Sequence, residues 1–258
     1  MQIGARIARA QLSGLGRSRR QIVVGPLVGL LHDEDTWFLS TMVAAEPGTP
    51  FDPDEVRESL AIVRKAFGAE GRWLSAELIE EANPGLAEEL EDNGMTIVSR
   101  PPLLVVEPDE LVQPVLPAGV TVRVVTSDAE QADGNAISAD AYETEDVGFP
   151  YQPVLADGGA VVVRVDGVPA ATAAWTAVAD GVTEVAGVGT VHSHRRQGLA
   201  GIATAYATQA AFEQAGATLA WLTPGDDGAD RVYRRVGYTP QATAVHLGDP
   251  GGHLADMR

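Results

Sequence analysis

One segment of the chain has the composition of a phosphate-binding loop: Arg195-Arg196-Gln197-Gly198-Leu199-Ala200-Gly201. It follows an expected strand at 183–191 and opens an expected long helix at 196–214. The first N–H groups of a helix have no acceptor within the helix, and the helix dipole adds partial positive charge there. Gly198 lets the backbone approach a ligand closely. The segment therefore predicts a site for a pyrophosphate or a similar anion.

The spacing of Arg195, Gly198 and Ala200 is R/Q-x-x-G-x-G/A, and it resembles the acyl-CoA signature of the GNAT family of acyltransferases. The resemblance implies a GNAT fold, a mixed α/β sheet, over about residues 120–247. It also implies acetyl-CoA as co-substrate and contacts to it from Arg195, Arg196, Gln197, Gly198, Leu199, Ala200 and Gly201. The same spacing occurs at 11–16, but there it follows an expected helix and precedes an expected strand, so we assign it no binding role.

A second motif supports the same resemblance: Tyr233-Arg234-Arg235-Val236-Gly237-Tyr238 is similar to the Y-x-x-x-G-F/Y segment that ends the last helix in many GNAT proteins. In that family a tyrosine at this place often lies near the thioester sulfur and protonates the departing thiolate. The resemblance implies this catalytic role for Tyr233. The alternative is a tyrosine packed against the core, followed by a glycine cap at Gly237.

Glu184 lies in the strand before the signature, where the resemblance to lysine-acetylating members of the family would place a catalytic glutamate. An amine with a pKa of about 10.4 is protonated at neutral pH, so a carboxylate or a water chain must remove a proton before attack. Glu184 could serve as that base. It could equally be a strand carboxylate that faces solvent.

The same resemblance assigns two backbone contacts to the cofactor. Val188 would contact the acyl carbonyl, where a main-chain donor stabilises developing negative charge, and Thr190 would contact the pantetheine arm. Gly187 and Gly189 fit a strand that bulges or splays to admit a ligand, although a bulge without function is also allowed.

Composition excludes several other kinds of chemistry. The chain has no cysteine, which excludes disulfides, zinc–thiolate sites and a cysteine nucleophile. The five histidines are scattered, and the acidic run at 226–230 is better suited to capping a helix than to binding calcium, so we expect no metal. The net charge of -18 disfavours nucleic acid and anionic lipid as partners and favours cationic substrates such as amines.

No segment of the sequence predicts a membrane span or a secretory signal. The longest apolar stretch, 22–31, is far shorter than the roughly 20 residues of a membrane helix and contains Pro26. The Arg-rich start of the chain superficially resembles a transit peptide, but Ile3, Ile7 and Leu12 favour a short amphipathic helix. We therefore expect a cytoplasmic protein.

A length of 258 residues favours two domains, and the prolines gathered between 101 and 117 predict the boundary between them. We expect an N-terminal α/β domain at 1–107, a linker at 108–119 and the GNAT domain at 120–258. The expected strands are 21–31, 36–44, 72–79, 95–99, 120–125, 160–165, 170–178, 183–191, 218–223 and 238–247. The expected helices after the first are one that starts at Pro53, followed by 84–92, 127–142, 196–214 and 227–236.

The two halves also resemble each other. Trp73-Leu74-Ser75 followed by Gly94 parallels Trp221-Leu222-Thr223 followed by Gly237, and Leu90 falls where Tyr233 does. This similarity indicates that the N-terminal half is a degenerate GNAT-like domain that lacks the phosphate signature and the acid.

The function that these features predict is transfer of an acetyl group from acetyl-CoA to a primary amine, of a small molecule or a protein, by direct attack in a ternary complex. The segment with Glu143, Glu145, Asp146 and Tyr151 would face the cationic amine, or else form a solvated loop. The alternative is a non-catalytic acyl-CoA sensor or interaction module. Such a module would keep the 195–201 loop and dispense with the roles of Glu184 and Tyr233.

Overall fold

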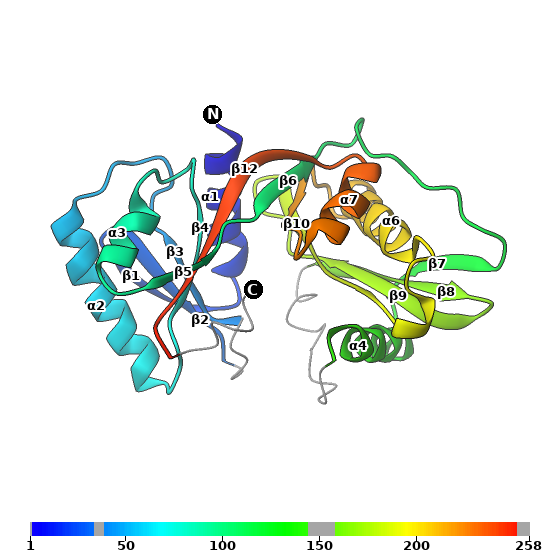
Figure 1. Ribbon diagram of the computed structural model, residues 1–258, viewed down its shortest axis with the longest axis horizontal. Helices are drawn as coiled ribbons and strands as arrows, with labels where there is room; N and C mark the ends of the chain where they lie inside the picture. The colour runs from blue at the N-terminus through cyan, green and yellow to red at the C-terminus, as the bar shows by residue number, and fades with distance from the viewer. Residues whose placement is uncertain (1, 34–38, 144–157, 252–258) are drawn as a thin grey trace. The chain divides into compact units, whose positions relative to one another are not determined.

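The computed structural model describes residues 2–33, 39–143 and 158–251, and the chain divides into two compact units (Figure 1). Unit 1 comprises Met1–Leu103 and Gln241–Arg258, and unit 2 comprises Leu104–Pro240. In the described part of the chain, no helix combines the length and apolar character that crossing a bilayer requires.

Unit 1 is built around a sheet in the order β1-β2-β3-β4-β12, with β5 also paired to β12. Its strands are β1 (Arg20–Val24), β2 (Leu27–Leu31), β3 (Thr41–Ala44), β4 (Ser75–Ile79), β5 (Thr96–Ser99) and β12 (Thr239–Gly248). Its helices are α1 (Ile3–Leu15), α2 (Pro53–Ala69) and α3 (Leu86–Asp92). β3 and β4 are parallel, and α2 connects them.

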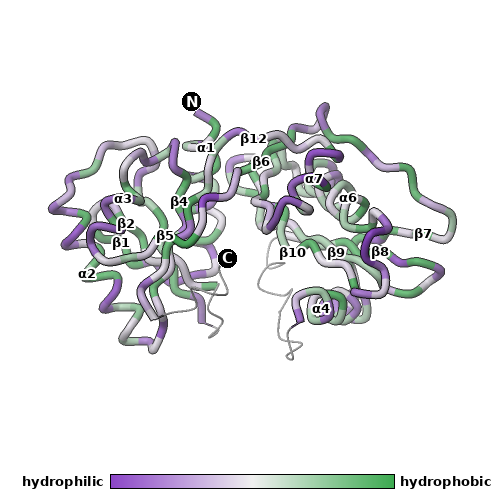
Figure 2. The backbone as a smooth tube through the Cα atoms, in the orientation of Figure 1, coloured by the Kyte–Doolittle hydropathy of each residue, from purple (hydrophilic) through white to green (hydrophobic). Residues whose placement is uncertain are grey.

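Strand β2 is buried on both faces of this sheet. Its side chains alternate between the two faces, as in any strand. Leu27 and Leu31 of β2 pack with the core under α2 and α3, whereas Val28 and Leu30 pack toward Leu12 of α1. In Figure 2 these strands carry the hydrophobic colour while much of α2 and α3 is hydrophilic on the outside. A continuous apolar run such as Leu27–Leu31 is therefore the expected signature of a strand with helices on both sides.

Unit 2 contains a sheet in the order β6-β11-β10-β9-β8-β7. Its strands are β6 (Pro102–Val106), β7 (Val120–Val124), β8 (Gly159–Val165), β9 (Val168–Trp175), β10 (Val182–Thr190) and β11 (Leu219–Leu222). Its helices are α4 (Asp128–Tyr142), the short 3-10 helix η2 (His192–His194), α6 (Leu199–Glu213) and α7 (Asp227–Arg235). Figure 1 shows α4 on one face of this sheet and α6 and α7 on the other.

Small side chains let the layers of unit 2 approach closely. Ala171 and Ala173 of β9 and Ala203 and Ala207 of α6 are fully buried in one core cluster. On the opposite face, a Cβ added to Gly189 of β10 would lie 3.1 Å from the Cβ of Ala141 in α4. The alanine-rich composition thus has a packing role: it brings both helices close to β10, the strand that precedes the predicted loop.

The observed units correct the domain boundaries expected from the sequence. The expected domains were 1–107 and 120–258, with a linker at 108–119. In the structure the last strand of each half joins the sheet of the other half: β6 pairs with β11, and β12 pairs with β4 and β5. The expected linker packs on unit 2, because Leu111 and Leu116 contact its core and the Val112 N–H donates to the Val236 carbonyl. Proline content marks irregular backbone, but it does not show where that backbone packs.

Most predicted elements are confirmed, with one clear error. The single strand expected at 21–31 is a hairpin, β1 and β2, which turns at Gly25 with φ of 51°. The helix expected after Pro47–Pro50 is confirmed, and the Asp52 side chain caps it by accepting from the Asp54 N–H. The N-terminal helix is also confirmed as α1, with Ile7 fully buried.

The internal similarity between the two halves is reflected in their topology. β3-α2-β4 and β10-α6-β11 are both parallel strand–helix–strand crossovers. Gly94 and Gly237, with φ of 92° and 104°, follow α3 and α7. The two tryptophans differ, however: Trp221 is buried in β11, whereas Trp73 precedes β4 and is 52% exposed.

Candidate active site

A bulge in β10 opens the sheet just before the signature loop. The register between β10 and β9 shifts between Ala186 and Gly189, and Gly187 has φ of 60°, a left-handed conformation that suits glycine. Among the described residues, β10 pairs with β11 only over Val182–Glu184. This pairing ends before the irregular stretch at Gly187 and Gly189, so the β11-facing edge of β10 has no strand partner from Val185 onward in the described part of the chain.

The signature loop connects this strand end to the start of α6. Arg196 and Gly198 both have positive φ, 67° and 80°, and Gly198 is the N-cap residue of α6, with no side chain capping the helix. The first bond of the helix runs from the Ile202 N–H to the Gly198 carbonyl, which leaves the preceding N–H groups without a helical acceptor.

The exposed surface of this loop fits a pyrophosphate. Arg196, Gln197 and Gly198 are exposed, and a Cβ added at Gly198 would meet nothing within 4 Å. Free backbone donors, the positive end of a fifteen-residue helix and open space therefore coincide at one place. The copy of the spacing at 11–16 lies inside and at the end of α1, where no such donors are available.

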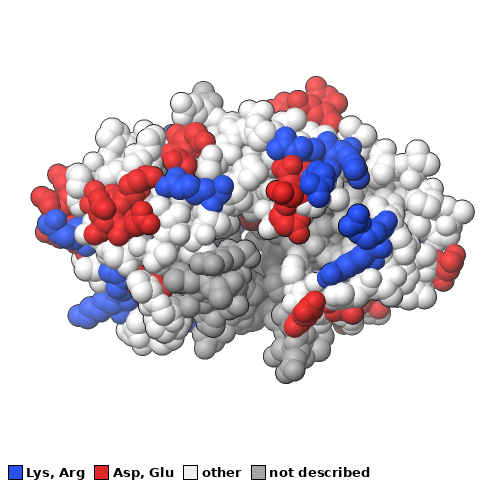
Figure 3. Space-filling view, in the orientation of Figure 1, with Lys and Arg blue, Asp and Glu red and all other residues white. Residues whose placement is uncertain are grey.

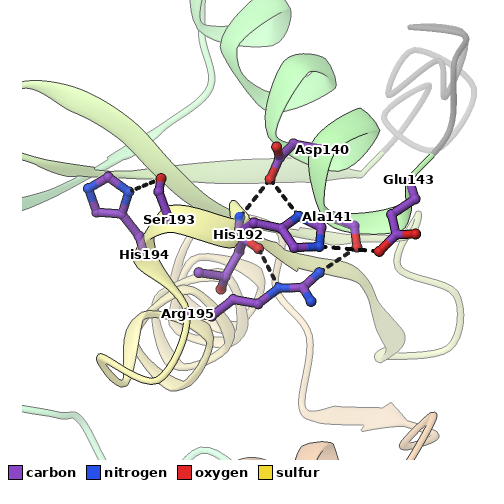
Figure 4. Close-up of polar contacts among 8 residues, drawn as sticks. Asp140, Ala141, Glu143, His192, Ser193, His194 and Arg195 are labelled. Atoms are coloured by element: carbon purple, nitrogen blue, oxygen red, sulfur yellow. Dashed lines mark hydrogen bonds and ion pairs between the residues drawn. The ribbon is translucent and has the colours of Figure 1, made fainter.

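Arg195, predicted to contact the cofactor, uses its side chain within the protein. Its guanidinium donates to the Ala141 carbonyl at 2.8 Å and to the Thr190 carbonyl at 3.4 Å (Figure 4). Ala141 lies in the last turn of α4, where carbonyl groups have no helical donor and a cation is favourable. Arg195 thus ties the loop to α4 and β10, and its backbone N–H donates to the His192 carbonyl at 3.3 Å.

A second link between α4 and the loop was missed by the sequence analysis. One carboxylate oxygen of Asp140, Oδ2, accepts from the His192 N–H at 2.6 Å and lies 3.1 Å from His192 Nδ1. The backbone hydrogen bond from His192 is the main reason that the pKa of Asp140 is lowered. Figure 4 shows both residues meeting beside Arg195. No local pattern could indicate this contact, because the partners are 52 positions apart.

The acidic segment expected to face an amine is only partly described. Glu143 follows α4 in a left-handed conformation with φ of 54°, and its Oε1 lies 3.2 Å from His192 Nε2. Glu143 therefore contacts η2, the segment that leads into the loop. Glu145, Asp146 and Tyr151 lie outside the described residues.

The backbone positions assigned to the acyl group and the pantetheine arm are fixed by neighbours. The Val188 carbonyl accepts from the Tyr142 hydroxyl at 3.1 Å, and the Thr190 carbonyl accepts from Arg195. The Thr190 hydroxyl oxygen is buried and has no hydrogen-bond partner in the described part of the chain. Both residues follow the bulge, where the strand edge is open.

Glu184 is half-buried and lies at the last position where β10 pairs with β11, just before the bulge. Its backbone exchanges hydrogen bonds with Thr176: the Glu184 N–H donates to Thr176 Oγ1 at 3.0 Å and its carbonyl accepts from the Thr176 N–H at 2.9 Å. Its neighbour Val185 is buried in the core cluster that includes α6. By alternation Glu184 therefore faces the opposite side of the sheet.

Tyr233 lies in α7, which packs on the first turns of α6: a Cβ added to Gly201 would lie 3.6 Å from Val232. Its ring is 6.4 Å from the ring of Tyr238, centroid to centroid. Burial, with a smaller effect of Asp226, raises the pKa of Tyr233 to about 12. Among the described residues its hydroxyl has no hydrogen-bond partner, whereas the Tyr238 hydroxyl lies 2.7 Å from Thr208 Oγ1.

Metal ligands do not gather at this site or elsewhere in the described residues, where no group of three or more His, Asp or Glu side chains could hold an ion. Asp226, within the acidic run considered above, caps α7 by accepting from the Ala229 N–H at 2.7 Å.

Comparison with known proteins identifies the family. The model of the Acetyltransferase (GNAT) family matches residues 131–238. A solved structure described as a GCN5-related N-acetyltransferase from Kribbella flavida is 74% identical, covers 99% of this chain and 99% of its own, and has a TM-score of 0.91. The chain therefore belongs to the GNAT family of acetyltransferases. None of the curated proteins matches it.

Two more distant structures share the fold. A conserved protein of unknown function from Staphylococcus epidermidis is 16% identical, with a TM-score of 0.64 over 94% of this chain and 98% of that one. A tandem GNAT protein from the clavulanic acid biosynthesis pathway is 16% identical, with a TM-score of 0.64 over 88% of this chain and 78% of that one. The predicted family and the tandem mixed α/β fold are thus confirmed.

Proposed function

We propose that unit 2 binds acetyl-CoA at the 195–201 loop and transfers the acetyl group directly to a primary amine of a cytoplasmic small molecule or protein. The observation that carries the proposal is the junction at Gly198. At this junction an exposed loop with a left-handed glycine leads into α6, and it follows the bulged strand β10. The unpaired N–H groups at the start of α6 therefore follow closely after the irregular part of β10.

The loop is held in place before any ligand arrives. Arg195 and His192 fasten it to Ala141 and Asp140 at the end of α4. A loop that is already ordered loses less conformational freedom when it binds, which favours affinity. We assign cofactor contacts to the backbone of Arg195 through Gly201, and further backbone contacts to Val188 and Thr190.

The acyl transfer moves protons off the nitrogen and onto the sulfur. Glu184, directly or through water, first takes a proton from the ammonium group, and the neutral amine nitrogen then attacks the thioester carbonyl. The resulting intermediate loses its second N–H proton to solvent as the carbon–sulfur bond breaks and the thiolate leaves. Tyr233 donates its phenolic proton to that thiolate. Because burial raises the pKa of Tyr233 to about 12, the phenol is protonated at neutral pH, and its hydroxyl is not committed to another described residue.

The charge of the protein is consistent with a cationic acceptor. The net charge of -18 attracts ammonium groups and disfavours nucleic acid and anionic membranes. The proposed role of Glu184 also requires that the acceptor arrives protonated, as a primary amine does at neutral pH.

The test replaces Tyr233 by Phe and measures kcat, KM and acetyl-CoA affinity. Loss of a general acid lowers kcat by about 100-fold or more, while acetyl-CoA affinity stays within about two-fold because the loop is untouched. Tyr238→Phe is the matched control: it removes a hydroxyl from the neighbouring ring, one that is already bonded to Thr208. Unchanged kcat in Tyr233→Phe would remove Tyr233 as the acid. A native protein that binds acetyl-CoA but acetylates no amine would instead favour a non-catalytic acyl-CoA-binding protein.

A further inference from the structure

Unit 1 contains a pocket of about 260 Å³ that the acyl-transfer proposal does not use. It lies where the β1–β2 turn, the segment between β3 and α2, and the segment between β4 and α3 meet. The pocket is lined by Gly25, Pro26, Glu46, Thr49, Pro50, Phe51, Glu55, Asn83 and Leu86. All of these residues belong to unit 1, so the pocket is complete within that unit.

The pocket occupies the place in unit 1 that corresponds to the signature loop in unit 2. In both units a strand, a loop and a helix lead into a parallel neighbouring strand, and the pocket adjoins the loop before the helix. In unit 1 that loop contains no match to the signature, and Asp52 occupies the start of α2 with its own carboxylate, which accepts from the Asp54 N–H at 2.9 Å. A pyrophosphate is thus excluded by charge and by an occupied donor.

The acidic residues around the pocket favour a cation instead. Glu46 and Glu55 line it, and Glu55 Oε1 would lie 2.8 Å from a Cβ added to Gly25, so this carboxylate is packed against the turn. Figure 3 shows acidic side chains gathered over the region of α3 and the start of α2. Arg9 contacts the segment between β3 and α2, where its guanidinium donates to the Pro47 carbonyl at 3.1 Å. Its charge is thereby directed at the backbone of the loop.

Asn83 supplies an independent sign of a ligand. Its side chain is 95% buried, being 5% exposed, and it lines the pocket. In the described part of the chain its amide makes no hydrogen bond, and Oδ1 is buried without a partner. An unsatisfied buried polar group costs about 1–3 kcal/mol, so a ligand N–H that reached Oδ1 would recover part of that cost.

The remaining wall of the pocket is apolar. Phe51, Pro26, Pro50 and Leu86 line it, and the Phe51 ring lies 3.8 Å from a Cβ added at Gly85. An aromatic ring beside carboxylates suits an ammonium group through its negative π face. The small volume limits the ligand to a few heavy atoms beyond that group.

We propose that this pocket binds a small organic ammonium ion that carries a short apolar chain. Glu46 and Glu55 attract the charge, Asn83 Oδ1 accepts an N–H, and Phe51 and Leu86 contact the chain. In this proposal the pocket beside the start of α2 in unit 1 binds a cation, whereas the start of α6 in unit 2 binds an anion. The inference does not depend on the acyl-transfer proposal.

The test titrates the full-length protein with n-butylammonium at pH 7 and follows the amide signals by two-dimensional NMR. We expect saturable shifts at Gly25, Gly48, Phe51 and the Asn83 side-chain amide. Neither n-butanol, which lacks the charge, nor butyrate, which reverses it, should shift these signals. Because exposed charge pairs contribute about 0.2–1 kcal/mol each, the double variant Glu46→Gln/Glu55→Gln should bind about two- to thirty-fold more weakly.

The matched control is Glu58→Gln/Glu91→Gln, which makes the same change in net charge at exposed positions of α2 and α3 outside the pocket. It should bind as the native protein does. Equal responses to butanol and butylammonium, native affinity in Glu46→Gln/Glu55→Gln, or shifts confined to the 195–201 loop would each overturn the proposal.

Discussion

The main-chain N–H of His192 donates to Asp140 Oδ2 over 2.6 Å, which joins the last turn of α4 to the segment that leads into α6. A carboxylate that accepts a backbone N–H is a strong, charge-assisted contact. Since His192 precedes Arg195 by only three positions, this contact and the Arg195–Ala141 contact together attach the start of the loop to the end of α4.

Replacing Asp140 by Ala should weaken acetyl-CoA binding without removing the chemistry. A hydrogen bond to a charged group contributes about 1.5–3 kcal/mol, and partial exposure of Asp140 places the effect at the low end, so we expect about a ten-fold rise in the KM for acetyl-CoA. kcat should change by less than about three-fold. Asp128→Ala, on the first turn of the same helix, is the control for loss of one charge. Equal effects of the two substitutions would show that Asp140 acts only through charge.

Ionisation of Tyr233 should not lower kcat near pH 10, where an ordinary tyrosine ionises. The active form is the protonated phenol, and burial raises the pKa of Tyr233 to about 12, so the phenol remains protonated well above pH 10. The same shift means that any stability linked to this group is complete below the unfolded pKa of about 10 and is lost as pH rises through the folded value. A fall in kcat with a midpoint below pH 10 that follows Tyr233 ionisation would contradict this assignment.

Tyr238→Phe should affect stability and leave catalysis intact. The Tyr238 hydroxyl is fully buried and lies 2.7 Å from Thr208 Oγ1, which itself donates to the Thr204 carbonyl at 2.8 Å. Removing one such bond lowers the free energy of unfolding by about 1 kcal/mol. Urea denaturation of Tyr238→Phe beside Tyr233→Phe checks the contrast. A larger loss of stability in Tyr233→Phe would indicate a packing role for Tyr233.

The exchanged strand β12 should control the stability of unit 1. Leu247 is fully buried in the core cluster with Leu78 and Met95, although it follows unit 2 in the chain. Leu247→Ala should lower the free energy of unfolding by about 2–5 kcal/mol. Hydrogen exchange should then increase first at β4 and β5, the partners of β12. Faster exchange at β8 and β9 instead would show that β12 stabilises unit 2, which would contradict this prediction.

The parts of this structure that could be predicted from sequence are those encoded locally. The loop at Gly198, the capping of α2 by Asp52 and the continuous apolar run of β8 depend on residues near one another in the chain, and their propensities agree with the fold. The hairpin at Gly25 was missed because both strands are apolar and the turn is only two residues long, so the run looked continuous.

The features that could not be predicted depend on long-range pairing. The exchange of β6 and β12 reflects which sheet edge each strand meets, and two similar apolar strands carry no local mark of that choice. The contacts of Asp140 with His192 and of Arg195 with Ala141 join segments more than fifty positions apart. Sequence identified Arg195 by its motif but could not show that its side chain turns inward.

The measurement that tests the central claim most directly is calorimetric titration of the protein with acetyl-CoA. We expect a Kd of about 1–100 μM for the native protein. Gly198→Glu should weaken binding by about 30-fold or more, because it adds left-handed backbone strain and a negative charge where the pyrophosphate binds.

Gly216→Glu is the matched control, since Gly216 also has a positive φ, 74°, with nothing within 4 Å of an added Cβ, but lies beyond the opposite end of α6. It should bind acetyl-CoA as the native protein does. Absence of binding by the native protein, or equal binding by Gly198→Glu, would contradict the assignment of the 195–201 loop as the acyl-CoA site.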